Sequence, residues 1–295
     1  MVEYMQGISV VIPCYNREAF LKEAIESVLA QQYHGPIEII VADDGSTDRS
    51  VEIATSFGSP VIVVKKPSDC KSQGAGMTRN RAIAASIYPF IAFLDSDDLF
   101  LPGHLQRLAE VLESDSNVGL VFDEAKTMVN GKLIDFPYPE WFKCSPDACA
   151  MLLEPLPQTN AMMINRRVLD QIVGPFDPDL MYSEDIDFRL RVAELFPVVF
   201  VKGYGSVIRN HDNRSIFNER GDVLFYNDML MINKATARYS YPKDLVSMKK
   251  SKMYYHLSVS KYKNKKYILS LICLFSALMT SPVLFLNKFI EKVKS

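Results

Sequence analysis

Short apolar runs, mostly of β-branched residues, alternate with amphipathic segments along the first third of the chain. Because a strand covered on both faces of a parallel sheet is apolar throughout, these runs predict buried strands. Apolar residues recur at helical spacing in 18–32, 51–57 and from Gly74 onward. This alternation is typical of βαβ units and predicts an α/β fold with a Rossmann-like, mostly parallel sheet flanked by helices. The predicted strands are 8–13, 37–42, 61–64 and 90–94.

Polar residues follow each of these strands. In open α/β sheets, ligands bind outside the carboxyl ends of the strands, so we expect these side chains to meet at one edge and form a ligand site. They are Tyr15 and Asn16, Asp43 and Asp44, Lys65 and Lys66, and Asp95 and Asp97.

The last of these strands runs directly into Asp95, Asp97 and Asp98. Three carboxylates within four residues repel one another, so a folded protein keeps them ionised mainly around a cation. The alternative is a solvated acidic turn in which Asp98 caps the helix near Pro102. Because polar residues arrive from all the predicted strands, the sequence favours a divalent metal site.

The middle of the chain is less regular. It predicts a helix at 105–112, strands at 118–122 and 162–164, and a hairpin turn at Asn130–Gly131. The stretch 135–158 is rich in proline and aromatic residues, and we interpret it as a loop that serves either binding or packing. A helix is expected to start at Ser183, whose side chain would cap it, with Glu184, Asp185 and Asp187 in its first turn.

Composition excludes some classes of protein. The 295 residues are 48% hydrophobic, enough for a large core, and the formal net charge of -2 argues against general nucleic-acid binding. The five cysteines lack paired C-x-x-C spacing, so neither a disulfide framework nor a zinc site is indicated. No charged-then-apolar leader precedes Ile8, and we expect a cytoplasmic protein.

Several motifs together resemble the family 2 glycosyltransferases of the GT-A fold, in the family's order and over roughly residues 8–212. Each motif alone is weak evidence for the family, and the resemblance does not extend to the C-terminal tail. The motifs are Ile12–Asn16, Asp43–Asp48, Arg79–Asn80, Phe93–Asp98, Gly174–Asp177 and Ser183–Asp185.

The resemblance implies a nucleotide-sugar donor, most often UDP-linked, a Mn²⁺ or Mg²⁺ ion and inverting transfer. Tyr15 would stack on the base, Asp44 would accept a hydrogen bond from it, and Asp95 would face the ribose or sugar. Asp97 would be the main metal ligand. The whole nucleotide-sugar site would comprise Pro13, Tyr15, Asn16, Asp43, Asp44, Gly74, Arg79, Asp95 and Ser96.

The resemblance also places the general base at Asp185, held by Glu184, and a histidine, His211, near the metal or diphosphate. The alternatives to His211 as a phosphate contact are Arg209 and Arg214. Departure of a nucleoside diphosphate builds negative charge that a divalent ion neutralises, while one carboxylate takes the proton of the attacking hydroxyl. No Gln-x-x-Arg-Trp motif follows the base, which favours transfer of a single sugar.

Two other functions stay open. A nucleotidyltransferase also uses a doubly wound sheet and a carboxylate-held metal. In that class, however, a glycine-rich loop with a basic residue would stand where this chain has Cys14–Asn16. A non-catalytic nucleotide-sugar-binding or scaffold subunit would need neither Asp97 nor Asp185.

The glycosyltransferase pattern stops near residue 217, which predicts a catalytic domain at 1–216 and a helical region at 217–295. Within that region 268–286 is uncharged and flanked by lysines. It would lie on the inner face of the cell membrane, pack on the catalytic domain or on another copy in a homo-oligomer, or span the bilayer. A lipid-linked acceptor suits the first interpretation. The acceptor is expected to be a glycan or a lipid-linked molecule in cell-surface polysaccharide synthesis.

Overall fold

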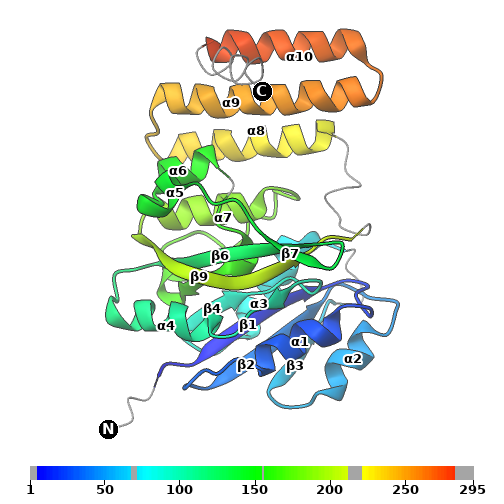
Figure 1. Ribbon diagram of the computed structural model, residues 1–295, viewed down its shortest axis with the longest axis vertical. Coiled ribbons are helices and arrows are strands. Elements are labelled where there is room, and N and C mark those ends of the chain that lie inside the picture. The colour runs from blue at the N-terminus through cyan, green and yellow to red at the C-terminus, as the bar shows by residue number, and fades with distance from the viewer. Residues whose placement is uncertain (1–4, 68–71, 155, 212–220, 283–295) are drawn as a thin grey trace. The chain divides into compact units, whose positions relative to one another are not determined.

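The computed structural model describes residues 5–67, 72–154, 156–211 and 221–282 (Figure 1). The chain divides into two compact units. The first comprises 1–151 and 155–211, and the second comprises 152–154 and 212–295. The predicted boundary between residues 216 and 217 falls in 212–220, outside the described residues.

Parallel strands form one half of the sheet in the first unit. β1 (Ile8–Cys14) lies between β2 (Ile37–Asp43) and β4 (Phe90–Phe93), and β3 (Val61–Lys65) pairs with the outer side of β2. Every residue of β1 is buried, as its uninterrupted apolar sequence requires. The predicted strands and their parallel arrangement are confirmed.

The sheet continues with mixed pairing. β8 (Met162–Asn165) runs antiparallel to β4 and to β6 (Leu120–Val129), and β9 (Val198–Arg209) runs parallel to β6. β5 (Leu99–Phe100) pairs with β9 at the edge. The predicted hairpin turn, with φ of 49° at Asn130 and 74° at Gly131, joins β6 to β7 (Lys132–Asp135).

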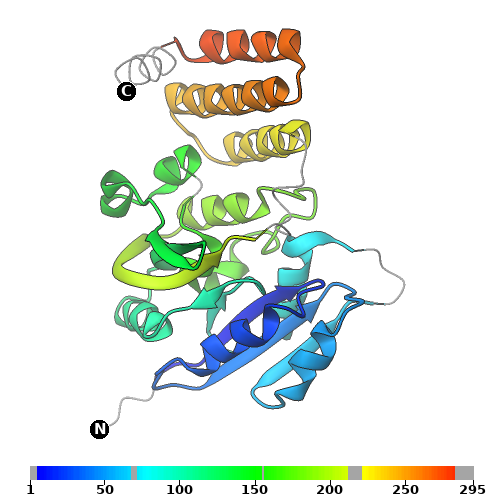
Figure 2. The same cartoon turned by 45° about the vertical axis from the view of Figure 1, so that its right-hand side comes forward.

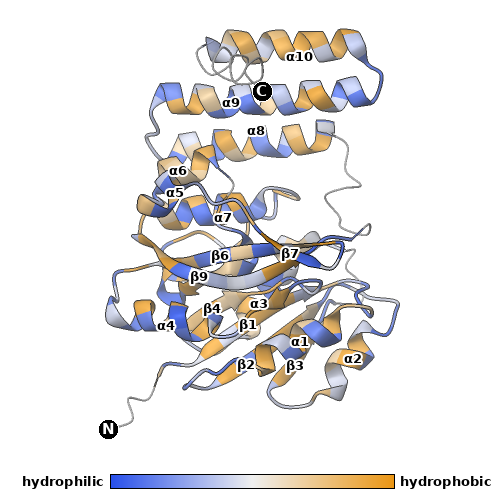
Figure 3. Cartoon of the chain, in the orientation of Figure 1, coloured by the Kyte–Doolittle hydropathy of each residue, from blue (hydrophilic) through white to orange (hydrophobic). Residues whose placement is uncertain are grey.

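Helices cover both faces of the parallel half. α1 (Leu21–Leu29) and α2 (Ser50–Ser56) lie on one face, and α3 (Gly74–Ala85) lies on the other (Figures 1 and 2). Figure 3 shows hydrophobic positions alternating with hydrophilic ones along these helices. In α1 the buried residues are Leu21, Ala24, Ile25 and Val28, at helical spacing.

The remaining helices of this part follow the sequence in most places. α4 (His104–Ser114) matches the predicted helix, and α7 (Glu184–Ala193) starts after Ser183. The stretch 135–158 is not an open loop, because it contains two short helices. Phe142, in the first of them, is buried. The short elements are α5 (Glu140–Cys144), α6 (Ala148–Leu153), η1 (Thr159–Ala161) and η2 (Arg166–Asp170).

The second unit is helical, with α8 (Gly221–Arg238), α9 (Lys243–Lys263) and α10 (Tyr267–Thr280). α9 and α10 contact each other through small residues: Ser251 Oγ donates to Ala277 O at 2.8 Å, and Ser270 Oγ donates to Ser258 O at 2.9 Å.

α10 covers the predicted apolar run from residue 268 to Thr280, and residues 283–286 lie outside the described residues. Within the part of the chain that is described, each helix is too short or too polar to cross a membrane.

Candidate active site

The loops after β1 and β2 hold each other in place. Thr47 N donates to Asn16 Oδ1 at 2.8 Å, and Asn16 N donates to Ser46 Oγ at 3.0 Å. Asp43 accepts the N–H groups of Gly45 and Ser46 and so fixes the second loop. Tyr15, at the start of the loop after β1, is 49% exposed, which leaves its ring available for stacking on a planar ligand.

Asp44 holds the start of α3. Its Oδ2 accepts the N–H groups of Gln73 at 3.1 Å and Gly74 at 3.3 Å, and its Oδ1 accepts Arg81 Nη2 at 3.0 Å. Gly74 has a φ of +81°, a conformation that a side chain would disfavour. Gly74 and Arg79, both predicted to belong to the nucleotide-sugar site, therefore lie in the first turns of α3, which Asp44 positions.

The acidic residues after β4 come together as predicted. Ligand oxygens of Asp95, Asp97 and Asp98 all lie within 4.8 Å of one another. Asp98 is fully buried, and its oxygens accept Arg209 N at 2.8 Å and Asn160 Nδ2 at 2.5 Å. It thus ties β4 to β9 and η1. It does not cap a helix, because α4 starts after Gly103 with no side-chain cap, so that interpretation was wrong.

Asp97 and His211 meet, although they are far apart in sequence. His211 Nε2 lies 3.0 Å from Asp97 Oδ2, and the His211 ring stacks on Phe20 with centroids 4.5 Å apart. Arg17 Nε donates to the same Asp97 oxygen at 3.2 Å. Carboxylate oxygens with one imidazole form a donor set that suits Mn²⁺ and, through the oxygens, Mg²⁺. The residues present therefore fit a divalent ion.

Arg209 is engaged by the protein itself. Its guanidinium donates to Asp97 O, to Phe20 O at 3.1 Å and to Glu23, and the residue is buried. These contacts leave Arg209 badly placed to bind a phosphate. Arg214, the other alternative to His211, lies outside the described residues.

Arg79 connects the acidic cluster to α7. Its guanidinium donates to Asp95 Oδ1 and, at 3.2 Å, to Glu184 Oε1. Gly76 allows this approach, because a Cβ at that position would lie 2.7 Å from Glu184 Cγ. Burial alone would lower the pKa of Arg79, but the Asp95 and Glu184 carboxylates outweigh burial and raise it. The acidic cluster after β4 and the carboxyl pair at the start of α7 therefore lie on either side of the Arg79 guanidinium.

Asp185 is held at the first turn of α7. Arg189 Nη1 donates to Asp185 Oδ2 at 3.0 Å, and Thr159 Oγ1 donates to the same oxygen at 3.2 Å. The Asp185 side chain is 31% exposed, so a substrate hydroxyl could reach it. Ser183 occupies the N-cap position with a φ of 65°, but its side chain makes no capping hydrogen bond, so that prediction was wrong.

Burial and charge separate the two neighbouring carboxyls. Burial raises the pKa of Glu184 to about 7, the Asp185 charge adds to the rise and Arg79 opposes it. Burial also acts to raise the pKa of Asp185, but Arg189 and Arg79 outweigh it, so that pKa lies below its usual range. Of the two neighbouring carboxyls, Asp185 is therefore the one that gives up its proton at lower pH.

Asp187 and Arg191 have a structural role. Arg191 Nε donates to Asp187 Oδ2 at 2.7 Å, while its other nitrogens donate to the carbonyls of 173–175. This arrangement fixes the turn at Gly174–Asp177 beside α7. Phe176 of that turn stacks on Phe188 with ring centroids 4.7 Å apart.

Sequence reasoning missed Arg17, Thr159 and Arg189. A signal existed for Arg189, because a base at Asp185 and an arginine four residues later share one helix face. Thr159 gave no signal, since η1 reaches Asp185 only through tertiary folding.

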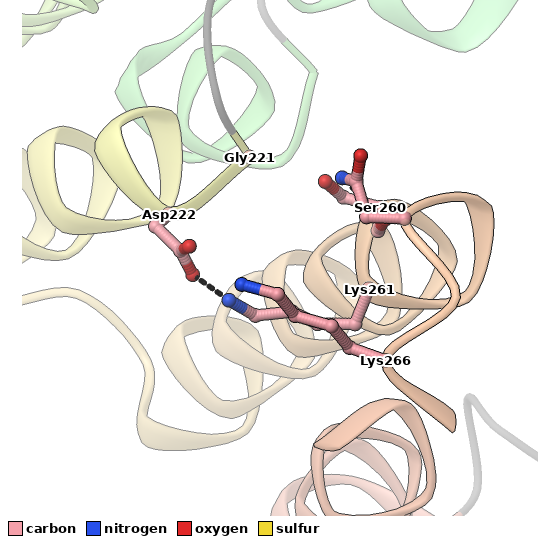
Figure 4. A pocket seen from close by; sticks show the side chains of 6 residues that line it. Gly221, Asp222, Ser260, Lys261 and Lys266 are labelled. Atoms are coloured by element: carbon pink, nitrogen blue, oxygen red, sulfur yellow. Dashed lines mark hydrogen bonds and ion pairs between the residues drawn. The ribbon is translucent and has the colours of Figure 1, made fainter. Parts of the chain in front are cut away.

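A polar cavity of about 350 Å³ lies in the second unit (Figure 4). Lys261 pairs with Asp222 at its wall. None of the predicted site residues lines it. The lining residues are Gly221, Asp222, Ser260, Lys261, Asn264 and Lys266.

The half-parallel sheet, the acidic cluster at its carboxyl edge and the carboxyl pair on α7 define a protein of the GT-A class. The model of the family described as glycosyl transferase family 2 matches residues 9–173, and the chain belongs to that family. The predicted family and fold are thereby confirmed.

Known proteins extend this assignment. An uncharacterised glycosyltransferase of Nostoc sp. (strain PCC 7120) is 36% identical over 176 residues, which cover 58% of this chain and 54% of that protein. The chain thus spans about half the length of this relative. Solved structures with the same fold include S. aureus TarS in complex with UDP-GlcNAc, with a TM-score of 0.70 and 17% identity over 92% of this chain and 79% of that one.

A second solved structure is the mannosyltransferase PcManGT from Pyrobaculum calidifontis, in complex with GDP-Man and Mn²⁺. It has a TM-score of 0.65 and 14% identity over 99% of this chain and 81% of that one. At such identities these structures support the fold and not the substrate.

Proposed function

We propose that this protein is a metal-dependent, inverting glycosyltransferase that moves one sugar from a nucleotide-sugar, a UDP-sugar in the first instance, to a glycan or lipid-linked acceptor. The observation that supports the proposal is the pair of ion pairs made by Arg79. They join Asp95, in the candidate metal site, to Glu184, the neighbour of the candidate base Asp185. A donor held at Asp95 and Asp97 therefore lies next to a carboxylate that can deprotonate an acceptor.

The nucleotide would lie on the loops after β1 and β2. Tyr15 would stack on the base, with Pro13, Asn16, Asp43 and Asp44 shaping the pocket and Gly74 and Arg79 closing it. Because Asp44 already accepts N–H groups of α3, its contribution would be mainly to position that helix. Asp95 and Ser96 would face the ribose or sugar.

A divalent ion, Mn²⁺ or Mg²⁺, would be held by Asp97 with His211. When bound, the ion neutralises the charge that builds on the departing nucleoside diphosphate. Asp185 would remove the proton of the acceptor hydroxyl as it attacks the anomeric carbon from the opposite face, so the configuration inverts and no protein nucleophile is needed. Arg189 and Thr159 keep Asp185 ionised and oriented.

We also propose that α10 rests on the cytoplasmic face of the membrane. One face of α10 contacts α9 through Ser270 and Ala277, and its other side exposes large apolar side chains beside the lysines of 261–266. Apolar residues next to cationic ones suit the surface of an anionic bilayer. The exposed residues are Ile268, Leu269, Leu271, Ile272, Phe275 and Met279. A role in cell-surface polysaccharide synthesis belongs to the same proposal, and a homo-oligomer formed through α10 is the alternative to membrane contact.

A donor screen tests the enzymatic proposal. Hydrolysis of UDP- and GDP-sugars is measured with Mn²⁺, with Mg²⁺ and with a chelator, for wild type and Asp97→Ala. We expect metal-dependent turnover of one donor class that Asp97→Ala abolishes. Turnover that survives both the chelator and the substitution would remove the metal from the proposal. Incorporation of nucleotide into a phosphosugar would instead favour a nucleotidyltransferase, and binding without turnover would favour a scaffold subunit.

A further inference from the structure

Two side-chain nitrogens meet one oxygen of Asp97. Arg17 Nε lies 3.2 Å and His211 Nε2 lies 3.0 Å from Asp97 Oδ2. The side chains of Arg17 and Asp97 are only 19% and 10% exposed, so water screens this ion pair weakly. A guanidinium and a divalent cation repel each other and therefore compete for that oxygen.

The Arg17 guanidinium lies between the loop after β1, where the nucleotide would lie, and Asp97 of the metal candidate. Its Nη1 donates to Asn16 O at 3.2 Å, on the loop after β1, while its Nε reaches Asp97. A diphosphate that linked a base on this loop to a metal at Asp97 would extend toward the same guanidinium. The Arg17 main chain is fixed, because its N–H donates to Ser50 Oγ at 2.8 Å. Only the side chain needs to move.

We propose that Arg17 exchanges partners during donor binding. It neutralises Asp97 while no metal is bound, and it moves to the diphosphate oxygens when a divalent ion takes Asp97. Both partners are anionic oxygens, and the planar guanidinium suits phosphate as well as carboxylate. This inference rests on the metal-dependent donor binding proposed above.

The exchange couples the two ligands. The metal releases Arg17 for the diphosphate, and the diphosphate draws Arg17 away from the metal ligand. Each ligand therefore strengthens binding of the other by the same factor.

Mn²⁺ titrations test the exchange without any turnover. Free Mn²⁺ is measured by electron paramagnetic resonance, with and without UDP, for wild type, Arg17→Ala, Arg17→Gln and Asp97→Ala. We expect both Arg17 variants to bind Mn²⁺ about three- to tenfold more tightly than wild type when UDP is absent. UDP should then increase Mn²⁺ affinity less than it does in wild type. The control is Arg49→Ala, whose side chain is 70% exposed and pairs with Glu52 on α2, and it should match wild type.

The outcomes separate this inference from the proposed function. If wild type binds Mn²⁺ no better than Asp97→Ala, the metal role itself fails. If wild type binds Mn²⁺ through Asp97, but the Arg17 variants bind it equally or more weakly while keeping the melting temperature of wild type, Arg17 only supports Asp97 and the exchange is refuted.

Discussion

At the scale of single residues, the neighbouring carboxyls Glu184 and Asp185 have different partners and opposite pKa shifts. Both lie at the first turn of α7, but Arg79 contacts Glu184, whereas Arg189 and Thr159 contact Asp185. Their pKa values move in opposite directions from the ordinary range. Neighbours in sequence can therefore have distinct tasks, and each task predicts a different measurement.

Asp185→Asn should remove the proton acceptor and keep the shape. We expect kcat for sugar transfer to fall by about 10² to 10⁴-fold, while the Kd for UDP changes by less than about threefold. Initial rates and calorimetric titration measure the two quantities. The control is Asp170→Asn, the same change at an exposed position in η2. If Asp185 only stabilised the start of α7, Asn would serve nearly as well, and transfer near the wild-type rate would refute the base.

Glu184 predicts a pH dependence of stability. Its pKa is about 7 in the folded protein, whereas an unfolded chain releases this proton near pH ~4.3. Between these values the folded state binds more protons, so the contribution of Glu184 to the free energy of unfolding falls as pH rises. Glu184→Gln does not titrate. Its free energy of unfolding, measured relative to that of wild type, should therefore rise by on the order of 1 to 3 kcal/mol between about pH 5 and about pH 8.

Thermal melts at several pH values, without metal, measure this difference. Glu26→Gln, the same change at an exposed position of α1, is the matched control for the substitution itself. A constant difference between Glu184→Gln and wild type over the same range would mean that Glu184 titrates like an ordinary carboxyl.

At the scale of elements, the sequence predicts best where the hydrophobic pattern is uninterrupted. The buried strands β1, β2 and β4 and the amphipathic α1 and α4 were predictable, because burial on known faces dictates their patterns. β9 was not, since Gly203 and Gly205 resemble chain breaks. A Cβ at Gly205 would lie 2.1 Å from both His104 Nδ1 and Asp123 Oδ2, so this glycine serves close packing inside a strand.

The candidate site was predictable to the same degree. Residues at strand ends and in the first turn of a helix follow from local pattern. The partners of Asp98, which are Arg209 N and Asn160, depend on how β4, β9 and η1 assemble. That assembly decides whether a carboxylate is free for a ligand, and no single segment encodes it.

The contact between α3 and α7 gives an element-scale prediction. Gly→Ala in a helix normally stabilises by about 0.5–1 kcal/mol. At Gly76 the added methyl would lie 2.7 Å from Glu184 Cγ and 3.3 Å from Phe176 Cβ. We therefore expect Gly76→Ala to destabilise by about 1–3 kcal/mol and to lower kcat, because Glu184 and Arg79 must shift.

Urea unfolding and initial rates measure both effects. The control is Ala75→Ser, which also adds one heavy atom to α3 but at an exposed position. A more stable Gly76→Ala with unchanged kcat would show that α3 and α7 separate at little cost.

At the scale of the whole molecule, the chain combines a family 2 sheet with a second, helical unit whose α10 exposes apolar residues. In the first unit, large apolar side chains are mostly inside, as in Phe93, Phe122 and Phe188. In α10 the exposed fractions reach 76% at Ile268 and 66% at Leu271. Concentrated exposure of this kind usually marks an interaction surface.

A paired substitution on that surface tests membrane contact. Leu271→Glu with Phe275→Glu places two charges on the exposed face of α10, and burying charge in a bilayer is unfavourable. We expect binding to vesicles of phosphatidylcholine with phosphatidylglycerol to fall at least about tenfold, while donor hydrolysis stays unchanged. Co-sedimentation measures the binding. Tyr226→Glu with Val223→Glu, on exposed positions of α8, is the matched control and should bind like wild type.

Salt and association state distinguish the remaining explanations. Binding that depends on anionic lipid and weakens with added salt supports contact through the lysines of 261–266 as well as the apolar face. A different result would refute the membrane proposal: wild type does not bind the vesicles and elutes as an oligomer, whereas the α10 variant elutes as a monomer. The exposed face of α10 would then bind a second copy of the chain.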